Sequence, residues 1–276
     1  MPKNFKAIVI DNKDEKFTRE VKDLNSDHLK DGNVLVRIDF SSLNFKDALI
    51  LNNGGRIVKK YPFVPGIDFS GTVEESEDEK FKKDDKVILT GFRVGEIYYG
   101  GFSQYAKVNS DFLVKLPKDL TNKKAMMMGT AGLTALLCSF AVKAKEELLM
   151  GSKVKDVLVT GATGGVGSFA VMALSKMGYD VHAVTGKKDK HDYLKKLGAK
   201  NILDRKEFLG ESKLLEKGMW DCVVDNVGGE GLTKILAQTK PGGIVALPGN
   251  AGGVKIATNT MPFVIRGVKL WGIDSS

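Results

Sequence analysis

Short segments in which apolar and polar residues alternate dominate the first third of the chain. Such alternation is typical of half-buried β-strands, and glycines separate one segment from the next. The segments are residues 5–10, 33–40, 67–74, 85–90 and 103–108. This density of short strands predicts a mostly antiparallel, barrel-like first domain.

From about residue 120 the pattern changes to helical segments that alternate with apolar strands. The predicted strands are residues 157–160, 181–185, 201–204, 221–225, 244–247 and 268–274. The predicted helices are residues 125–137, interrupted near 129–132, and 166–177, 189–197, 207–216 and 231–239. Repeated strand–helix units require a parallel sheet with right-handed crossovers. We therefore predict an α/β fold, with a barrel-like domain at 1–120 and a doubly wound parallel sheet at 121–276.

A glycine-rich turn, Thr160-Gly161-Ala162-Thr163-Gly164-Gly165-Val166-Gly167, follows the first strand of the second domain. In dinucleotide-binding folds one glycine permits the bend, one lets backbone N–H groups approach a pyrophosphate, and one lets the helix pack closely. A glycine turn without a ligand is the alternative, but the order strand, turn, helix, strand favours a cofactor. The predicted cofactor contacts in the turn are Gly161, Thr163, Gly164, Gly165 and Val166.

The end of the next strand indicates which dinucleotide is bound. NAD sites usually carry an acid there, whereas this chain has Thr185-Gly186-Lys187-Lys188. A hydroxyl, a free glycine N–H and ammonium groups suit a 2′-phosphate, so Thr185, Gly186 and Lys187 predict NADPH. The alternative is that the lysines merely flank a helix. Arg205, after the following strand, either adds to this site or is a surface residue.

Composition narrows the classes of partner. The formal net charge is 42 − 34 = +8, which favours anionic ligands. The lysines are scattered among acids, so we expect no specific nucleic-acid site. The N-terminus lacks a signal-peptide core and no apolar run looks long enough to span a bilayer, which predicts a cytoplasmic protein that binds no membrane.

The cysteines and histidines give no sign of a metal site. The cysteines, Cys138 and Cys222, lie far apart in apolar surroundings and are predicted to be buried thiols. The three histidines fall in unrelated contexts with no cysteine nearby. A zinc site of the usual Cys/His type is therefore not expected.

Several motifs together resemble the zinc-free medium-chain dehydrogenase/reductase family, in its YhdH-type quinone oxidoreductase or acrylyl-CoA reductase subgroup. The motifs are Ser42-Leu43-Asn44-Phe45-Lys46-Asp47-Ala48, Pro65-Gly66-Ile67-Asp68-Phe69-Ser70-Gly71, Gly129-Thr130-Ala131-Gly132-Leu133-Thr134-Ala135, the turn at 160–167, Asp225-Asn226-Val227-Gly228-Gly229, and Met261-Pro262-Phe263-Val264-Ile265-Arg266-Gly267-Val268. The resemblance implies a GroES-like β-barrel domain before a Rossmann domain. It also implies NADPH as the hydride donor and reduction of a carbon–carbon double bond conjugated to a carbonyl or thioester.

The chain departs from the family picture at three places. Gly66-Ile67-Asp68 stands where zinc-dependent relatives have a histidine and an acid, so zinc-type alcohol oxidation is not expected. Phe45 replaces a tyrosine that is frequent in the subgroup, so another group or water must give the proton. The family continues past residue 274 with a segment that returns to the first domain. Without that segment we expect apolar surface on the first strands to be uncovered. Both an active and an inactive protein are consistent with the sequence.

The resemblance also implies roles for individual residues. Asn44 is expected to donate to the substrate carbonyl or the nicotinamide ribose, and Asp47 to orient Lys46 or a protonating water. Helix capping is the alternative role for Asn44 and Asp47. Thr130 is expected at the nicotinamide. The remaining predicted cofactor contacts are Asn226, Gly249 and Asn250, and Arg266 either binds phosphate or locks a loop.

Three functions remain open from sequence alone. The first is an NADPH-dependent enoyl-thioester reductase acting on a substrate such as acryloyl-CoA, with Arg56, Lys59 and Lys60 near the coenzyme A tail. The second is a quinone or enone reductase. The third is an inactive NADPH- or RNA-binding module. Strand 268–274 at a sheet edge predicts a homodimer.

Overall fold

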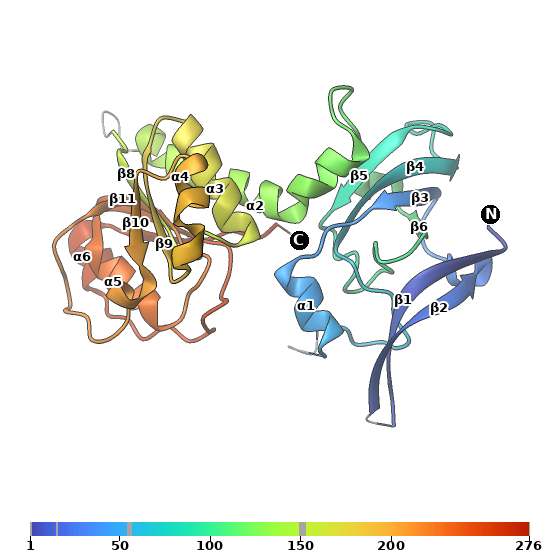
Figure 1. Cartoon of the computed structure of the whole chain (residues 1–276), viewed down its shortest axis with the longest axis horizontal. Coiled ribbons are helices and arrows are strands. Elements are labelled where there is room, and N and C mark those ends of the chain that lie inside the picture. Colours follow the sequence, from blue (N-terminus) through green and yellow to red (C-terminus); the bar gives the residue numbers. More distant parts are fainter. Residues whose placement is uncertain (1, 15, 54–56, 149–152, 276) are drawn as a thin grey trace. The chain divides into compact units, whose positions relative to one another are not determined.

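The computed structural model describes residues 2–14, 16–53, 57–148 and 153–275 (Figure 1). The chain divides into two compact units, one that ends at Thr130 and one that begins at Ala131. The division falls within helix α2 (Asn122–Leu148), where Gly129 has the non-helical angles φ 49° and ψ −154°. We describe each unit by itself, as unit 1 and unit 2.

Unit 1 is built from antiparallel strands, as the alternating segments predict. Its five-stranded sheet has the order β6-β3-β4-β5-β7. The strands are β3 (Val34–Phe40), β4 (Asp68–Ser76), β5 (Lys86–Thr90), β6 (Tyr105–Val108) and β7 (Val114–Lys115). A hairpin of β1 (Asn4–Lys13) and β2 (Lys16–Asn25) and the helix α1 (Phe45–Leu51) complete the unit, with short turns η1 (Ser26–His28) and η3 (Ser110–Phe112). The GroES-like antiparallel domain is therefore confirmed.

The first strand buries its apolar side chains, contrary to the expectation of uncovered surface on the first strands, whereas Phe40 at the end of β3 is 42% exposed. Phe5, Ala7 and Val9 are each at most 5% exposed and pack with Leu35 and other apolar residues of unit 1. The exposed large hydrophobic of the hairpin is Val21 on β2. Burial of this face stabilises the hairpin against the five-stranded sheet.

Unit 2 contains a six-stranded parallel sheet of order β10-β9-β8-β11-β12-β13, which confirms the doubly wound Rossmann fold. The strands are β8 (Asp156–Val159), β9 (Asp180–Thr185), β10 (Asn201–Asp204), β11 (Trp220–Val224), β12 (Thr239–Leu247) and β13 (Lys269–Gly272). The helices are α3 (Gly165–Lys176), α4 (His191–Lys196), α5 (Glu230–Gln238) and α6 (Met261–Arg266), with short turns η4 (Lys188–Lys190) and η5 (Arg205–Phe208). The strand order reverses between β8 and β11, and ligands of such sheets bind at this reversal.

Successive residues of each strand point to opposite faces of the sheet and contribute to two hydrophobic cores, one on each face. Val157 and Val159 pack with residues of α2, α3 and α4, while Leu158 between them packs with residues of α5. Both faces are therefore covered, as a parallel sheet requires. This burial holds the carboxyl ends of the strands in fixed positions, from which the candidate site projects.

The predicted helix at 207–216 is wrong. Only η5 is helical there, and the chain then runs irregularly to β11. Long-range contacts fix this path, because the Glu216 N–H donates to the Ala237 carbonyl at 3.0 Å and Arg266 donates to the carbonyls of Glu216, Ala237 and Thr239. Of the two roles foreseen for Arg266, the structure supports the locking of a loop.

Helix α2 corrects the expectation about membrane spans. Residues 125–142 contain no charged side chain, and α2 is long and apolar enough to cross a membrane by length and composition. Most of this apolar window is buried inside the protein and the helix is broken at Gly129. These are the properties of a core helix, and one such helix is weak evidence for a span.

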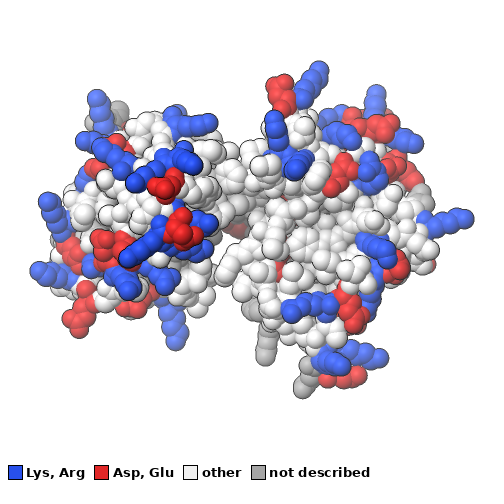
Figure 2. Space-filling view, in the orientation of Figure 1, with Lys and Arg blue, Asp and Glu red and all other residues white. Residues whose placement is uncertain are grey.

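Charged residues of both signs mix on the face shown in Figure 2, where Lys and Arg side chains alternate with Asp and Glu. The lysines were predicted to be solvated among acids, and this face agrees. This face therefore carries no broad basic surface that would attract an anionic ligand by its overall charge.

Candidate functional site

The glycine turn, residues 160–167, connects β8 to α3 at the reversal of strand order. Gly161 has φ +56°, a left-handed conformation that favours glycine. A Cβ on Gly167 would lie 2.3 Å from the Gly161 carbonyl oxygen and 2.7 Å from Ala162 Cα, so α3 packs directly on the turn. Gly164 and Gly165 are exposed at its tip. The turn therefore offers backbone N–H groups to a ligand while its base is packed.

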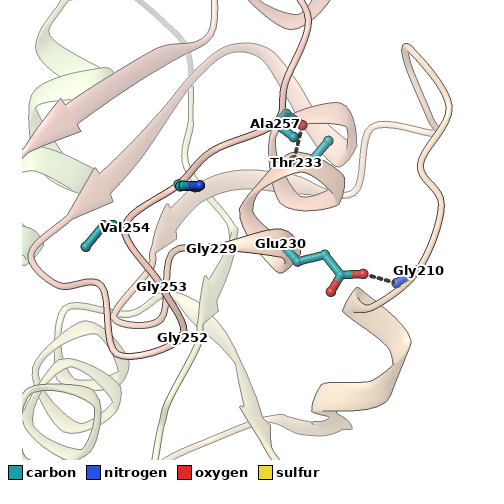
Figure 3. Close-up of a pocket in the computed structure, with 9 residues that line it drawn as sticks. Gly210, Gly229, Glu230, Thr233, Gly252, Gly253, Val254 and Ala257 are labelled. Carbon is teal, nitrogen blue, oxygen red and sulfur yellow. Dashed lines mark hydrogen bonds between the residues drawn. The ribbon is translucent and has the colours of Figure 1, made fainter.

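The start of α3 is better suited to a phosphate than the start of α5. The N-cap of α3 is Gly164, without a side-chain cap, and its first turn contains no acid. The amides of a helix's first turn lack intrahelical partners and attract anions. Helix α5 instead begins with Glu230, whose carboxylate accepts from the Gly210 N–H at 3.0 Å (Figure 3). The adjoining cavity of about 600 Å³ is lined by this acid and by Lys255, so it has no excess of positive charge for an anion.

Asp225 ties the glycine turn to the loop after β11. Its Oδ1 accepts from the Thr160 hydroxyl at 2.5 Å and from the Val227 N–H at 3.2 Å, and its Oδ2 accepts from the Gly228 N–H at 3.1 Å. The side chain is fully buried, and this burial raises its pKa. The network fixes Thr160 at the point where the chain leaves β8.

Of the predicted contacts, Asn226 lies against the same turn, Gly249 packs on Asn226, and Asn250 lies close to Gly228 in the loop after β11. Asn226 donates from Nδ2 to the Thr160 carbonyl at 2.7 Å and from its N–H to the Thr160 hydroxyl at 3.0 Å. A Cβ on Gly249 would lie 3.0 Å from the Asn226 carbonyl oxygen, so the loop after β12 packs on the loop after β11. The structure thus gathers these residues with the glycine turn at one edge of the sheet.

The residues predicted for the 2′-phosphate also come together. Thr185 ends β9 and pairs with Asp204 at the end of β10, directly before Arg205. A Cβ on Gly186 would lie 2.8 Å from Arg205 Nε, so the arginine lies over this glycine. Lys187 is exposed, and its N–H donates to the Thr185 hydroxyl at 3.1 Å. Two cationic side chains and a hydroxyl therefore border the ends of β9 and β10.

Asp68 organises the predicted site residues of unit 1. It is fully buried and its carboxylate accepts from Ser42 N (2.9 Å), Ser42 Oγ (2.6 Å), Asn44 Nδ2 (3.0 Å), Thr130 N (2.9 Å) and Thr130 Oγ1 (2.9 Å). We call Ser42, Asn44, Asp68 and Thr130 the Asp68 cluster. Gly129 is required beside it, because a Cβ there would lie 2.6 Å from Ser42 Oγ.

The geometry changes the role expected of Asn44. Its Nδ2 donates to Asp68 Oδ2 and, at 3.1 Å, to Ser42 Oγ. An amide nitrogen has two hydrogens, so both are used within the protein. Asn44 is therefore a poor donor to a substrate carbonyl, and it also begins α1 as the N-cap of a capping box with Asp47.

Asp47 caps a helix rather than facing a ligand. Its Oδ2 accepts from the Asn44 N–H at 2.8 Å and its Oδ1 from the Ile67 N–H at 3.0 Å, and the side chain is fully buried. Burial raises the pKa of Asp47 to about 6, against the opposing effect of these hydrogen bonds. The expected action of Asp47 on a protonating water is therefore not supported, whereas the capping alternative is.

Lys46 has an acidic partner in another loop. Its Nζ lies 2.7 Å from Glu96 Oε1, and Arg93 approaches the other oxygen of Glu96 at 3.3 Å. The Lys46 side chain is 31% exposed and Glu96 is 7% exposed, so the lysine tip is held at the surface of unit 1. Phe45 beside it is 60% exposed and offers no hydroxyl.

A cavity of about 880 Å³ in unit 1 is lined in part by Lys60. The charged side chains around it are Asp27, Lys30, Asp31, Lys60 and Lys107. Aromatic side chains, including Tyr98 and Phe112, form another part of the wall. Lys59 is exposed, and Arg56 lies outside the described residues.

Both cysteines are buried free thiols, as predicted. Burial raises the pKa of Cys138 to about 12 and that of Cys222 to about 11, which keeps both thiols protonated at neutral pH. Among residues 2–14, 16–53, 57–148 and 153–275, no three His, Cys, Asp or Glu side chains group as metal ligands would.

Asp68 and Asp225 are the organising residues that sequence reasoning missed, although both stand in the quoted motifs. A signal was present in each case. Asp68 opens an apolar strand and Asp225 follows one, and an acid at such a position is rarely buried without partners. The partners lie up to 65 residues away in sequence, for instance Thr160 for Asp225, so they could not be named.

Comparison with known proteins agrees with this arrangement. Residues 30–118 match the alcohol dehydrogenase GroES-like domain and residues 165–275 match the zinc-binding dehydrogenase family. The acrylyl-CoA reductase AcuI of Ruegeria pomeroyi is 48% identical over 274 residues, which are 98% of this chain and 82% of that protein.

Solved structures are equally similar. The yhdH oxidoreductase of Salmonella enterica in complex with NADP has a TM-score of 0.92 and 46% identity, covering 98% of this chain and 82% of that one. The Bacillus subtilis protein yhfP with NAD bound has a TM-score of 0.90 and 41% identity, covering 99% of this chain and 82% of that one. The chain therefore belongs to the medium-chain dehydrogenase/reductase superfamily, in the subgroup of the AcuI acrylyl-CoA reductases and the YhdH and YhfP oxidoreductases.

Proposed function

We propose that this protein is an NADPH-dependent, zinc-independent reductase of the conjugated double bond of an enoyl thioester such as acryloyl-CoA. The observation that carries the proposal is the 48% identity to an acrylyl-CoA reductase along 98% of the chain. The reaction consumes the thioester, NADPH and a proton, and yields the saturated thioester and NADP⁺.

The residues of unit 2 fit the cofactor. The glycine turn and the uncapped start of α3 would hold the pyrophosphate, through Gly161, Thr163, Gly164, Gly165 and Val166. Thr185, Gly186, Lys187 and Arg205 would hold the 2′-phosphate, because hydroxyl and cationic groups border the ends of β9 and β10. Asn226, Gly249 and Asn250 would line the path of the remaining dinucleotide. When bound, NADPH supplies the hydride.

The residues of unit 1 would act at the reacting end. Thr130, fixed by Asp68, would contact the nicotinamide, and Asn44 would keep this cluster in place rather than bind the substrate carbonyl. Lys46, held by Glu96, would hold the water or deliver the proton that reaches the α-carbon, since Asp47 is committed to capping and Phe45 has no hydroxyl.

The cationic residues Lys59 and Lys60 would contact the phosphates of coenzyme A. Both are exposed, and Lys60 lines the cavity of about 880 Å³, whose aromatic wall would suit the apolar parts of the carrier. We place the reaction in the cytoplasm.

The edge strand β13 suggests a homodimer. It pairs with β12 on one side, and its Trp271 is 45% exposed. A second copy that extends the sheet would cover this edge. Light scattering of the full chain should therefore give twice the mass of one chain, and a single monomeric mass contradicts the assembly.

Steady-state NADPH oxidation with acryloyl-CoA, a short enone and a quinone, measured side by side, tests the substrate. We expect kcat/KM for acryloyl-CoA to exceed that for the other acceptors by at least about tenfold, because only the thioester carries a coenzyme A tail. Turnover with the quinone and none with the thioester would instead make this a quinone reductase. Tight NADPH binding without any turnover would indicate an inactive binding module.

A further inference from the structure

Asp68 does more than fill a buried position, because every hydrogen bond to its carboxylate runs in the same direction. An ionised carboxylate only accepts hydrogen bonds, and the structure places five N–H or O–H donors around it. Four of these five are at Oδ2, namely the Ser42 and Thr130 hydroxyls, the Thr130 N–H and Asn44 Nδ2. Ser42, Asn44 and Thr130 therefore each direct at least one hydrogen toward Asp68.

Asp68 constrains both the hydroxyl and the backbone N–H of Thr130. A threonine hydroxyl has one hydrogen and two lone pairs. Because Thr130 Oγ1 gives its hydrogen to Asp68 Oδ2 at 2.9 Å, it meets any further group as an acceptor. The Thr130 N–H is held by the same oxygen at 2.9 Å, so neither the backbone nor the side chain can turn away without losing a buried hydrogen bond.

We propose that Asp68 is a positioning residue that makes Thr130 Oγ1 an acceptor for the carboxamide N–H of the nicotinamide. The inference rests on the proposed function, which places Thr130 at the nicotinamide. The carboxamide N–H₂ group offers two donors and a nicotinamide ring has no other N–H, so the complementary partner is an acceptor with a fixed direction.

Gly129 permits the backbone conformation that this arrangement of Thr130 requires. Its φ of +49° breaks α2, and a Cβ there would lie 2.8 Å from Asp68 Oδ2. The helix is thus interrupted at the residue that brings the Thr130 amide and hydroxyl onto one carboxylate oxygen. A regular helix would point the Thr130 N–H along its axis instead.

The test measures binding of two oxidised cofactors to the full chain by calorimetry, without turnover. One is NADP⁺ and the other is 3-acetylpyridine-NADP⁺, in which an acetyl group replaces the carboxamide and removes both N–H donors. We expect the unmodified chain to bind NADP⁺ about five- to tenfold more tightly, as one hydrogen bond allows. Asp68→Ala should remove this preference, and Asp68→Asn should keep it, because an amide oxygen at the Oδ2 position still accepts from Thr130.

Asp39 supplies the matched control. It too accepts from a hydroxyl and an amide, namely Thr72 Oγ1 at 3.1 Å and Asn122 Nδ2 at 2.5 Å, but it contacts neither Thr130 nor Asn44 in the hydrogen bonds of the described residues. Asp39→Ala should lower the melting temperature yet leave the preference for NADP⁺ unchanged. Equal preferences in Asp68→Ala and Asp39→Ala would reduce Asp68 to a structural role and overturn the proposal.

Thr130 variants keep the test decisive if Asp68→Ala fails to fold. Thr130→Val should abolish the preference for NADP⁺ and Thr130→Ser should keep it, and a preference that survives in Thr130→Val overturns the proposal. If the unmodified chain binds both cofactors equally, this inference fails while the proposed function stands. If it binds neither, both fail.

Discussion

Replacing Lys187 by Glu is expected to weaken NADPH binding by about 100-fold while NADH binding changes by no more than about threefold. The reason is that Lys187, Arg205 and the Thr185 hydroxyl border the ends of β9 and β10. A reversed charge removes an attractive partner of the 2′-phosphate and adds a repulsive one, whereas NADH carries only a hydroxyl there. Dissociation constants from cofactor fluorescence check the result.

Lys190→Glu is the matched control. It makes the same change of charge three residues further on, in the short turn η4 that Lys187 precedes, where Lys190 already pairs with Asp189 at 3.4 Å. It should leave the ratio of the two dissociation constants within about twofold of the unmodified chain, because screening weakens exposed charges at a distance. An unchanged ratio in Lys187→Glu would mean that the phosphate binds elsewhere.

Gly167→Ala is expected to impair both folding and cofactor binding. The added Cβ would lie within 2.9 Å of three backbone atoms of Gly161 and Ala162, and none of these is the flexible end of a side chain. Helix α3 must therefore move away from the turn, at a cost of about 1–3 kcal/mol in unfolding free energy. Because the helix carries the phosphate-binding amides with it, NADPH and NADH should both bind at least about tenfold more weakly.

Gly231→Ala separates this clash from a general effect of alanine. Gly231 also lies in the first turn of a helix of unit 2, α5, but its nearest neighbour to an added Cβ is Phe208 O at 3.5 Å, an ordinary contact. It should be neutral or stabilising by up to about 1 kcal/mol, since alanine favours helix over glycine. Denaturant unfolding compares the two variants, and equal stabilities would contradict the packing argument.

The sequence predicted the parts of the fold that local patterns determine. The alternation of β8 to β13 with helices was visible, because buried parallel strands are short apolar runs between glycines. Strand β2 escaped notice because its residues are mostly exposed and polar, which leaves no alternation to detect. The helix expected at 207–216 failed since distant carbonyls and Arg266 hold that segment in an irregular path.

In the candidate site too, groupings that follow from strand order could be predicted, and those that depend on distant residues could not. The grouping of Thr185, Gly186, Lys187 and Arg205 follows from the order of parallel strands, and it was predictable. The direction of the Asn44 amide was not, because it depends on Asp68, 24 residues further along the chain. The buried carboxylate of Asp68 accepts a hydrogen of the Asn44 amide, which was expected to donate to the substrate, and this gives Asn44 a structural role.

The central claim is that the protein moves a hydride from NADPH to the β-carbon of an enoyl thioester. Incubation of the full chain with acryloyl-CoA and NADPH that carries deuterium at C4, in the two stereochemical forms separately, tests it most directly. Mass spectrometry and NMR of the product should show one deuterium at C3 of propionyl-CoA from one form and none from the other. Unlabelled propionyl-CoA from both forms, or deuterium at C2, would contradict the claim.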